Sequence, residues 1–474
     1  MCPLRDDLRR EVASLHSFVE SISHACAPAP QSSAYPESSS KFFEYVAHLA
    51  DCTKKRIAGF ETHAEDSEDD FQEARAELQT IRAAWRELHQ FIKPSVDADT
   101  LSQPSAMAAA LVHRLRQLRG FEGSDFVLFH TDTFDYLQAN PGATGDALDQ
   151  LARIVDADRF DRNLGLIGLP NSQGNALFMN CLLAHEIGEY VYAKRSVEKI
   201  LGTRAASALH KHYEGSFTKL ERTDQSRLTQ TVVGWAKELY CDLFAVRFIG
   251  PCYTFAYVDL FDLANLLDKT GSRLVEEIDK QPQIRFYRSY PSHPFRVKAQ
   301  VELLKSEGWW DYIKELDCRA CAFLRAVLEL KSERFVEVEE VGPDPRVSLL
   351  KALNDVLSDV RQQVVAATDG IDPGLYEYGE LWSPIADYLR NGVVPSTLVL
   401  EAEKGKCVEV HPTPTTLLNA AYRFYLVGVE ELMSGIKAQD PSLAEKRTFW
   451  MKRIENWTAK ALEDVALMRD STIK

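Results

Sequence analysis

The sequence lacks any apolar run long enough to cross a lipid bilayer. Its most apolar stretch, Tyr253–Leu267, is shorter than a membrane span and carries Asp259 and Asp262. The start of the chain also lacks a signal-peptide pattern, because charged residues interrupt the apolar positions throughout Leu4–Glu20. We therefore expect a protein with no membrane span and a cytoplasmic location.

Positive charge is in short supply. The chain holds 55 Lys and Arg against 70 Asp and Glu, for a formal net charge of -15 at pH 7. Because such a chain repels phosphate, we expect no nucleic-acid partner and no anionic membrane surface as a partner. Glycine-rich phosphate loops of the Walker or dinucleotide type are absent from the sequence as well.

Paired cysteines are also scarce. The nine cysteines, an odd number, are scattered over the chain, which favours reduced thiols over a disulfide framework. Cys318 and Cys321 form the one CxxC motif, and no second pair completes a zinc site of the cysteine type. The pattern favours two thiols buried in a helix.

The length of 474 residues and the hydrophobic content of 45% are enough for two or three domains with a substantial core. Helical periodicity dominates the first part of the chain and returns in its last third, where it predicts helices over 311–331, 347–367, 415–436 and 443–467. The sequence therefore predicts a mainly α (α+β) fold with a helical N-terminal domain (1–120), a central domain (121–305) and a helical C-terminal domain (306–474).

The central region contains the predicted strands. Two short apolar runs bounded by turn residues, Phe126–His130 and Leu164–Leu169, indicate strands. Apolar helices are expected at Ala176–Tyr192 and at Thr231–Phe248. Since Leu164–Leu169 directly precedes the first of these helices, it would be the natural edge strand for pairing with an extended peptide, and a core strand is the alternative interpretation.

The first of these helices carries the most informative motif. His185 and Glu189 lie four residues apart, so their side chains leave the same face of the helix on adjacent turns. An imidazole and a carboxylate placed in this way are able to bind one divalent cation. Glu186 is offset by one residue, which suits a base that activates water beside the cation.

The second helix carries two further carboxylates at the same spacing. Glu238 and Asp242 lie four residues apart within an otherwise apolar pattern. Acidic groups on such a helix need compensation, which either a solvent-facing stripe or a bound metal ion provides. The sequence of this helix leaves both alternatives open.

Taken together, these motifs resemble the HExxH and ExxxD pair of the gluzincin metallopeptidases. The segment Ser292-His293-Pro294, with Arg296 close behind, resembles the Ser/Thr-His-Pro segment of the branch that contains the CAAX prenyl proteases and the bacterial heat-shock membrane proteases. The order of the three elements agrees with that branch over residues 126–303. The resemblance implies a zincin-like metallopeptidase core between the two helical flanks.

Carried over by position, the resemblance assigns a role to each residue. It implies that His185, Glu189 and Glu238 bind the metal and that Glu186 is the general base. Asp242 would accept a hydrogen bond from the far ring nitrogen of His185, which fixes the tautomer of the ligand.

The resemblance also supplies groups for the transition state. His293, or alternatively Arg296, would stabilise the oxyanion that forms when water attacks a peptide carbonyl. The expected partner is therefore a peptide or protein, as substrate or as ligand.

Glu189 departs from the family pattern, which has a second histidine at this position. Two carboxylates and one neutral imidazole cancel the charge of a dication, which weakens its action as a Lewis acid. The harder ligand set lets Mn2+ or Fe2+ compete better with Zn2+, the expected cofactor. His210 and His212 are too close in sequence to replace the missing ligand, and His130 is more distant.

Three interpretations follow from this departure. The chain is a working metallopeptidase, or it is a weak or inactive pseudo-metallopeptidase that acts as a protein-binding or regulatory module. The third interpretation is a structural helical protein in which the motifs match by accident.

Overall fold

The computed structural model of the chain is mostly helical, with two small sheets. The residues that the structure describes are 3–26, 37–63, 68–98, 102–131, 137–139, 141–159, 164–170, 176–213, 217–263, 291, 293–329, 345–402, 406–433 and 442–472. The prediction of a mainly α fold with a short β-sheet is confirmed. Among the described residues, no helix has both the length and the apolar character that a membrane crossing requires.

The chain divides into two compact units. The first comprises residues 1–116 and 121–175, and the second comprises residues 117–120 and 176–474. The boundary at residue 175 lies inside the range 121–305 that the sequence analysis assigns to one domain. The predicted strands therefore group with the N-terminal helices, whereas both motif helices belong to the second unit.

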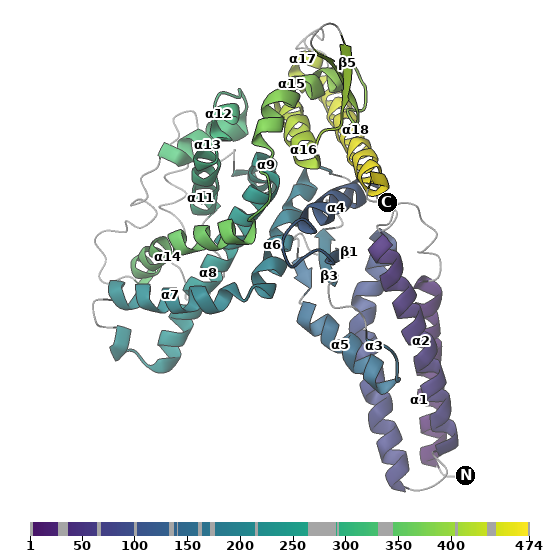
Figure 1. Ribbon diagram of the computed structural model, residues 1–474. Helices are drawn as coiled ribbons and strands as arrows, with labels where there is room; N and C mark the ends of the chain where they lie inside the picture. The colour runs from purple at the N-terminus through teal and green to yellow at the C-terminus, as the bar shows by residue number, and fades with distance from the viewer. Residues whose placement is uncertain are drawn as a thin grey trace. The chain divides into compact units, whose positions relative to one another are not determined.

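Three long helices build the core of the first unit. The helices α1 (Pro3–Cys26), α2 (Glu37–His63) and α3 (Glu68–Ala98) lie side by side (Figure 1). Apolar residues at helical spacing point inward from all three and leave the polar positions outside. Inside this core, the indole nitrogen of Trp85 donates a hydrogen bond of 3.1 Å to the hydroxyl of Thr53.

A three-stranded sheet belongs to the same unit, together with α4 (Ser102–Leu115) and α5 (Pro141–Ile154). The central strand β3 (Leu164–Pro170) pairs in parallel with β1 (Asp125–Thr131) and antiparallel with β2 (Leu137–Ala139). The two predicted strands are confirmed. The expectation that 164–169 forms a sheet edge is wrong, because β2 occupies the side where a peptide would pair.

The second unit is built around α8 (Arg222–Ile249), which is buried along most of its length. It packs against α6 (Leu183–Lys194), α7 (Val197–His212), α11 (His293–Ser306) and α14 (Pro345–Ala367), as Figure 1 shows. A helix that is covered by so many neighbours has few exposed positions. The acidic side chains in its C-terminal half, Glu238 and Asp242, are buried and therefore need partners inside the protein.

Gly188 allows α6 and α8 to approach each other closely. A Cβ atom at this position would lie 3.0 Å from Cα of Cys241 and 3.2 Å from its carbonyl oxygen. Any residue other than glycine would push the two helices apart. The close approach brings the motif of α6 next to the motif of α8.

The C-terminal end of α8 is fixed from another helix. Gly250 ends α8 with a φ of 80°, and Pro251 begins α9 (Pro251–Leu260) directly afterwards. The amide of Asn419, on α16 (Pro414–Arg423), donates to the Ile249 carbonyl at 2.8 Å and accepts from the Cys252 N–H at 2.9 Å. One buried side chain thus satisfies both backbone groups at the junction.

The other elements of the second unit surround these helices. They are the 3-10 turns Met179–Leu182 and Phe217–Lys219, α12 (Trp310–Ile313), α13 (Arg319–Glu329), α15 (Leu375–Arg390), the hairpin strands β4 (Leu398–Ala402) and β5 (Lys406–Val410), the π-helical turn Phe424–Gly428, α17 (Val429–Met433) and α18 (Leu443–Thr472). The helix that the pattern predicts over 311–331 is interrupted, because α12 ends at Ile313 and α13 begins at Arg319.

Candidate metal centre

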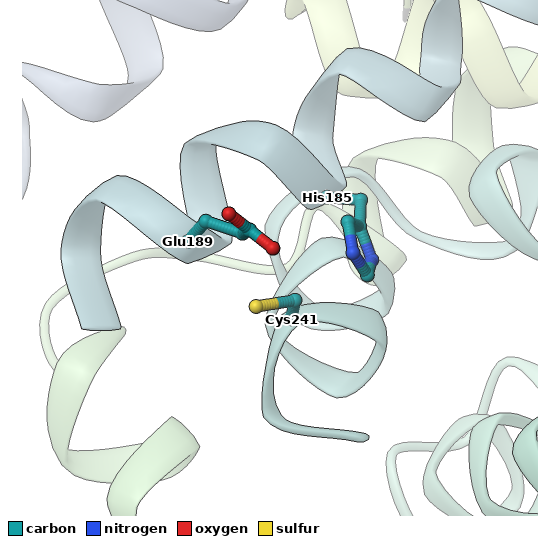
Figure 2. Close-up of side chains that lie close together, drawn as sticks. All are labelled: His185, Glu189 and Cys241. Carbon is teal, nitrogen blue, oxygen red and sulfur yellow. The ribbon is translucent and has the colours of Figure 1, made fainter. Parts of the chain in front are cut away.

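The crossing of α6 and α8 gathers potential metal ligands. His185 and Glu189 come from α6 and Cys241 comes from α8, and one donor atom of each lies within 4.8 Å of the others. Figure 2 shows the three side chains directed toward a common space between the two helices. Nitrogen, oxygen and sulfur are all donors that bind divalent transition metals.

The orientation of the His185 ring is set by Asp242. Nδ1 of His185 lies 3.0 Å from Oδ1 of Asp242, and the hydroxyl of Tyr253 lies 3.3 Å from the same nitrogen. Tyr253 also donates to Asp242 at 2.5 Å. Since an ionised carboxylate only accepts, the proton on the imidazole must sit on Nδ1. In a neutral imidazole, Nε2 then carries the lone pair, on the side of the ring away from Asp242.

Asp242 is kept ionised by a buried arginine. Arg296 binds it through two bonds, from Nε at 2.6 Å and from Nη2 at 2.8 Å. Burial alone would raise the pKa of Asp242, but the charge and hydrogen bonds of Arg296 outweigh it and hold the pKa well below its usual range. The role that the resemblance implies for Asp242 agrees with its contact to His185.

Glu238 lies on the open side of the imidazole. Its Oε2 atom is 3.5 Å from Nε2 of His185 and 3.3 Å from Nη2 of Arg296. Burial opposes protonation of His185, yet hydrogen bonds to Asp242 and Glu238 raise its pKa to about 10. In this state the imidazolium supplies the positive charge between the two carboxylates that a cation would otherwise supply.

Glu189 is paired with a cation from the neighbouring helix. The ammonium of Lys237 lies 2.8 Å from Oε1 of Glu189. Burial lowers the pKa of Lys237, but attraction to Glu189 outweighs it and the net pKa is raised. Lys237 therefore stays charged and competes for the carboxylate that the sequence assigns to the metal.

Glu186 is buried beside these groups. Its side chain belongs to α6, and the residue is only 5% exposed. Burial raises its pKa to about 7, while the neighbouring His185 acts in the opposite direction. A carboxyl group with a pKa near neutrality is able both to accept and to return a proton at physiological pH.

His293 and Arg296, which were predicted to stabilise the oxyanion, lie on α11, and both have other partners. Nδ1 of His293 is 2.8 Å from the Tyr257 hydroxyl, and its ring packs against the ring of Phe261 with centroids 4.1 Å apart. Arg296 is committed to Asp242 and Glu238, and it also lies over the ring of Tyr257. The contacts of Arg296 are those of a group that positions other side chains.

Cys241 is the donor that the sequence analysis missed. It lies three residues after Glu238, so it shares that face of α8. It is fully buried, and burial, followed by the nearby Glu189 and Glu238 charges, raises its pKa well above the usual value. The signal available in the sequence was this spacing, although nothing else in the sequence separates Cys241 from the other eight cysteines.

The distances between these donor atoms can be compared with those between the ligands of a zinc ion. Ligand atoms around a tetrahedral zinc ion lie about 3.5 Å apart, given bond lengths of about 2.0–2.3 Å. The Nε2-to-Oε2 distance of 3.5 Å between His185 and Glu238 matches this spacing. The group of His185, Glu189 and Cys241, within 4.8 Å, requires only a small contraction. His185, Glu189 and Cys241 therefore fit a divalent cation, and Glu238 approaches this group at His185.

His210 and His212 lie outside this cluster. His210 is exposed on the last turn of α7, and His212 binds Asp355 of α14 at 2.8 Å. His130 is in β1 of the other unit, and its side chain is outside the described residues, as is Ser292.

Comparisons with protein-family models, with curated proteins and with solved structures give no match to this chain.

Proposed function

We propose that the chain is a metal-dependent peptidase whose centre lies between α6 and α8. His185, Glu189 and Glu238 bind the cation, and Glu186 is the general base. One observation carries the proposal. Oδ1 of Asp242 lies 3.0 Å from Nδ1 of His185, while Oε2 of Glu238 lies 3.5 Å from Nε2 of the same ring. This arrangement of a carboxylate, an imidazole and an open ring nitrogen is typical of histidine ligands in metal sites.

The chemistry divides between the cation and the side chains. A divalent cation held there would polarise the carbonyl of a peptide bond and acidify water beside it. Glu186 would accept the proton of the attacking water and return it to the leaving amine, which its pKa of about 7 permits. Arg296 keeps Asp242 ionised and so holds the imidazole in the binding tautomer.

A specific observation also favours a second candidate function. If Cys241 binds together with His185, Glu189 and Glu238, four protein ligands surround the ion. Such a site is closed to substrate and is characteristic of structural zinc. The chain would then be a metal-stabilised binding module, and the sulfur donor would favour Zn2+ over Mn2+.

Metal analysis tests the site itself. The purified protein is expected to hold about one divalent ion per chain, and Glu238→Ala is expected to lose it. Glu198→Ala, at an exposed position on α7, serves as the control and should keep the ion. A folded wild-type protein that takes up no zinc from solution would refute both candidate functions.

Cobalt substitution distinguishes an open site from a closed one. A thiolate bound to Co2+ gives a charge-transfer absorption that oxygen and nitrogen ligands do not give. The peptidase proposal expects no such band, and an unchanged spectrum in Cys241→Ser. A band in the wild type that disappears in Cys241→Ser would favour the closed site.

Peptide cleavage tests the proposed roles on α6. Glu186→Gln is expected to lower turnover by at least about a hundredfold while it retains the metal, because only the base is removed. If the wild type has no turnover and Glu189→His gains it, the natural chain is an inactive scaffold, and the peptidase proposal fails.

A further inference from the structure

The CxxC motif lies away from the proposed metal ligands, in the second unit. Cys318 immediately precedes α13, and its carbonyl accepts the first helical hydrogen bond, from the Ala322 N–H at 3.1 Å. This is the N-cap position. Cys321 lies inside the first turn of the helix and is only 1% exposed, whereas Cys318 is half-buried.

The backbone N–H of Cys321 donates a hydrogen bond of 3.5 Å to the sulfur of Cys318. The Cys321 thiol also acts on this sulfur electrostatically, as a side-chain donor. Free backbone N–H groups and the positive end of the helix dipole both favour a thiolate at this position. The sulfur thus occupies the place that a serine or threonine hydroxyl occupies in an ordinary N-cap.

The two thiols respond in opposite directions to this arrangement. The hydrogen bond from Cys321 lowers the pKa of Cys318 to about 7, although burial acts against it. The same bond, followed by burial, raises the pKa of Cys321. The charged groups around the pair are Asp259 from α9, Arg325 from α13 and Arg423 from α16.

We propose that Cys318 and Cys321 form a redox-active dithiol that exchanges with small-molecule disulfides, with Cys318 as the attacking sulfur and Cys321 as the resolving sulfur. The proposal is independent of the metal centre. A half-buried thiolate is accessible to a small disulfide, and the buried Cys321 lies one helical turn away, with its backbone N–H donating to the first sulfur.

The exchange balances in two steps with glutathione disulfide as the oxidant. The Cys318 thiolate attacks one sulfur, a Cys318–glutathione bond forms, and the first glutathione leaves with the electron pair of the broken bond. Cys321 then gives its proton to solvent and attacks Cys318, which releases the second glutathione. The protein dithiol loses two electrons and becomes a disulfide, and one glutathione disulfide becomes two thiols.

The test follows the full-length protein with glutathione disulfide at pH 7, using alkylation and peptide mass spectrometry. Cys318 should react about fivefold faster than an ordinary exposed thiol, since its larger thiolate fraction outweighs its lower intrinsic nucleophilicity. The product should be the Cys318–Cys321 disulfide. Exposed Cys407, in β5, provides the internal comparison.

Variants separate the two roles. Cys321→Ala is expected to stop at a mixed disulfide on Cys318, and Cys318→Ser is expected to lose the fast reaction while serine still caps the helix. Cys407→Ser, the matched control, should behave as the wild type. If Cys321→Ala does not fold, rapid alkylation of the wild type should still trap the mixed disulfide on Cys318.

Two results would overturn the proposal. One is a reaction at Cys407 that is as fast as, or faster than, the reaction at Cys318. The other is a wild-type product that keeps glutathione on Cys318 and contains no Cys318–Cys321 disulfide.

Discussion

At the scale of single residues, the candidate metal centre is a cluster of acidic and basic side chains, most of them buried. Three carboxylates, those of Glu189, Glu238 and Asp242, meet the cations Lys237 and Arg296 and the imidazole of His185. Arg296 is only 5% exposed and is shared by two acids. The positive charges thus hold the carboxylates together without a metal, and a metal must compete with some of them.

Lys237 is the cation most easily displaced, because its side chain is 35% exposed. We expect Lys237→Met to tighten zinc binding about five- to tenfold, since an ion pair of about 1 kcal/mol no longer competes for Glu189. Competition with a fluorescent chelator measures the change. Lys199→Met, at an exposed position on α7, should leave the affinity unaltered.

Weaker or unchanged zinc binding in Lys237→Met would contradict this assignment. It would indicate that Glu189 is not a ligand and that its pairing with Lys237 is only structural.

The contact between His185 and Asp242 was expected from the resemblance to the HExxH and ExxxD motif pair, whereas helical spacing alone places His185 with Glu189, and Glu238 with Asp242, on shared faces. The sequence could not predict the partners of Asp242 from α9 and α11, Tyr253 and Arg296, as one cluster. A local sequence pattern determines neither how these helices cross nor how each helix is rotated about its axis. For Cys241, the spacing from Glu238 indicates a shared face of α8, but it does not show that His185 and Glu189 of α6 lie opposite that face.

At the scale of elements, periodicity predicted the long helices well, and α14 and α18 begin within two residues of their expected starts. It failed where short elements decide the topology. The three-residue strand β2 carries too little pattern to recognise, yet its pairing makes β3 a central strand. The zincin-like core implied by the resemblance stays a prediction.

The spacing of α6 and α8 depends on Gly188. We expect Gly188→Ala to cost about 1–3 kcal/mol of stability, because its methyl group would overlap the backbone of Cys241. Zinc binding should weaken as well, since the ligands come from both helices. Chemical denaturation and metal titration of the same protein measure the two effects.

Gly202→Ala is the matched control, because it is also in a helix and its Cβ would have 4.0 Å of clearance from Val233. Alanine there should be neutral or should stabilise α7 by up to about 1 kcal/mol. If Gly188→Ala behaves in the same way, the two helices are not held by close contact at Gly188.

At the scale of the whole molecule, a buried acid on α18 makes stability depend on pH. Glu455 is 8% exposed and accepts hydrogen bonds from the backbone of Leu177 and Phe178, ahead of α6. Burial raises its pKa from 4.5 to about 7, against the pull of Lys452 and these bonds. The folded state therefore holds this proton more tightly than the unfolded state does.

The direction of the effect follows from linkage. The contribution of the protonated Glu455 to the free energy of unfolding is fully present below about pH 4.5 and is lost as the pH rises through about 7. We expect Glu455→Gln to be more stable than the wild type by about 2–3 kcal/mol at pH 8 and to differ little at pH 4.5. Denaturation midpoints across this range provide the measurement.

The control is Glu445→Gln, at an exposed position on the same helix, which should follow the wild type at every pH. A constant difference between Glu455→Gln and the wild type from pH 4.5 to 8 would show that Glu455 does not change its charge state in this window.

The division into two units places all the proposed metal ligands in the second unit. Every proposed ligand, the base and Arg296 lie between residues 185 and 296, within the second unit, whereas the first unit has its own apolar core. We expect the fragment 176–474 to bind zinc with an affinity within about threefold of the full chain. Arg195 would lose one bond in this fragment, to the carbonyl of Arg119.

Circular dichroism and metal titration of the fragment provide the measurement. A fragment that folds but binds no zinc would mean that residues 1–175 supply part of the centre, and the ligand set proposed from α6 and α8 would then be incomplete. If binding is retained, the first unit is free to have another role, because the metal centre needs no residue from it.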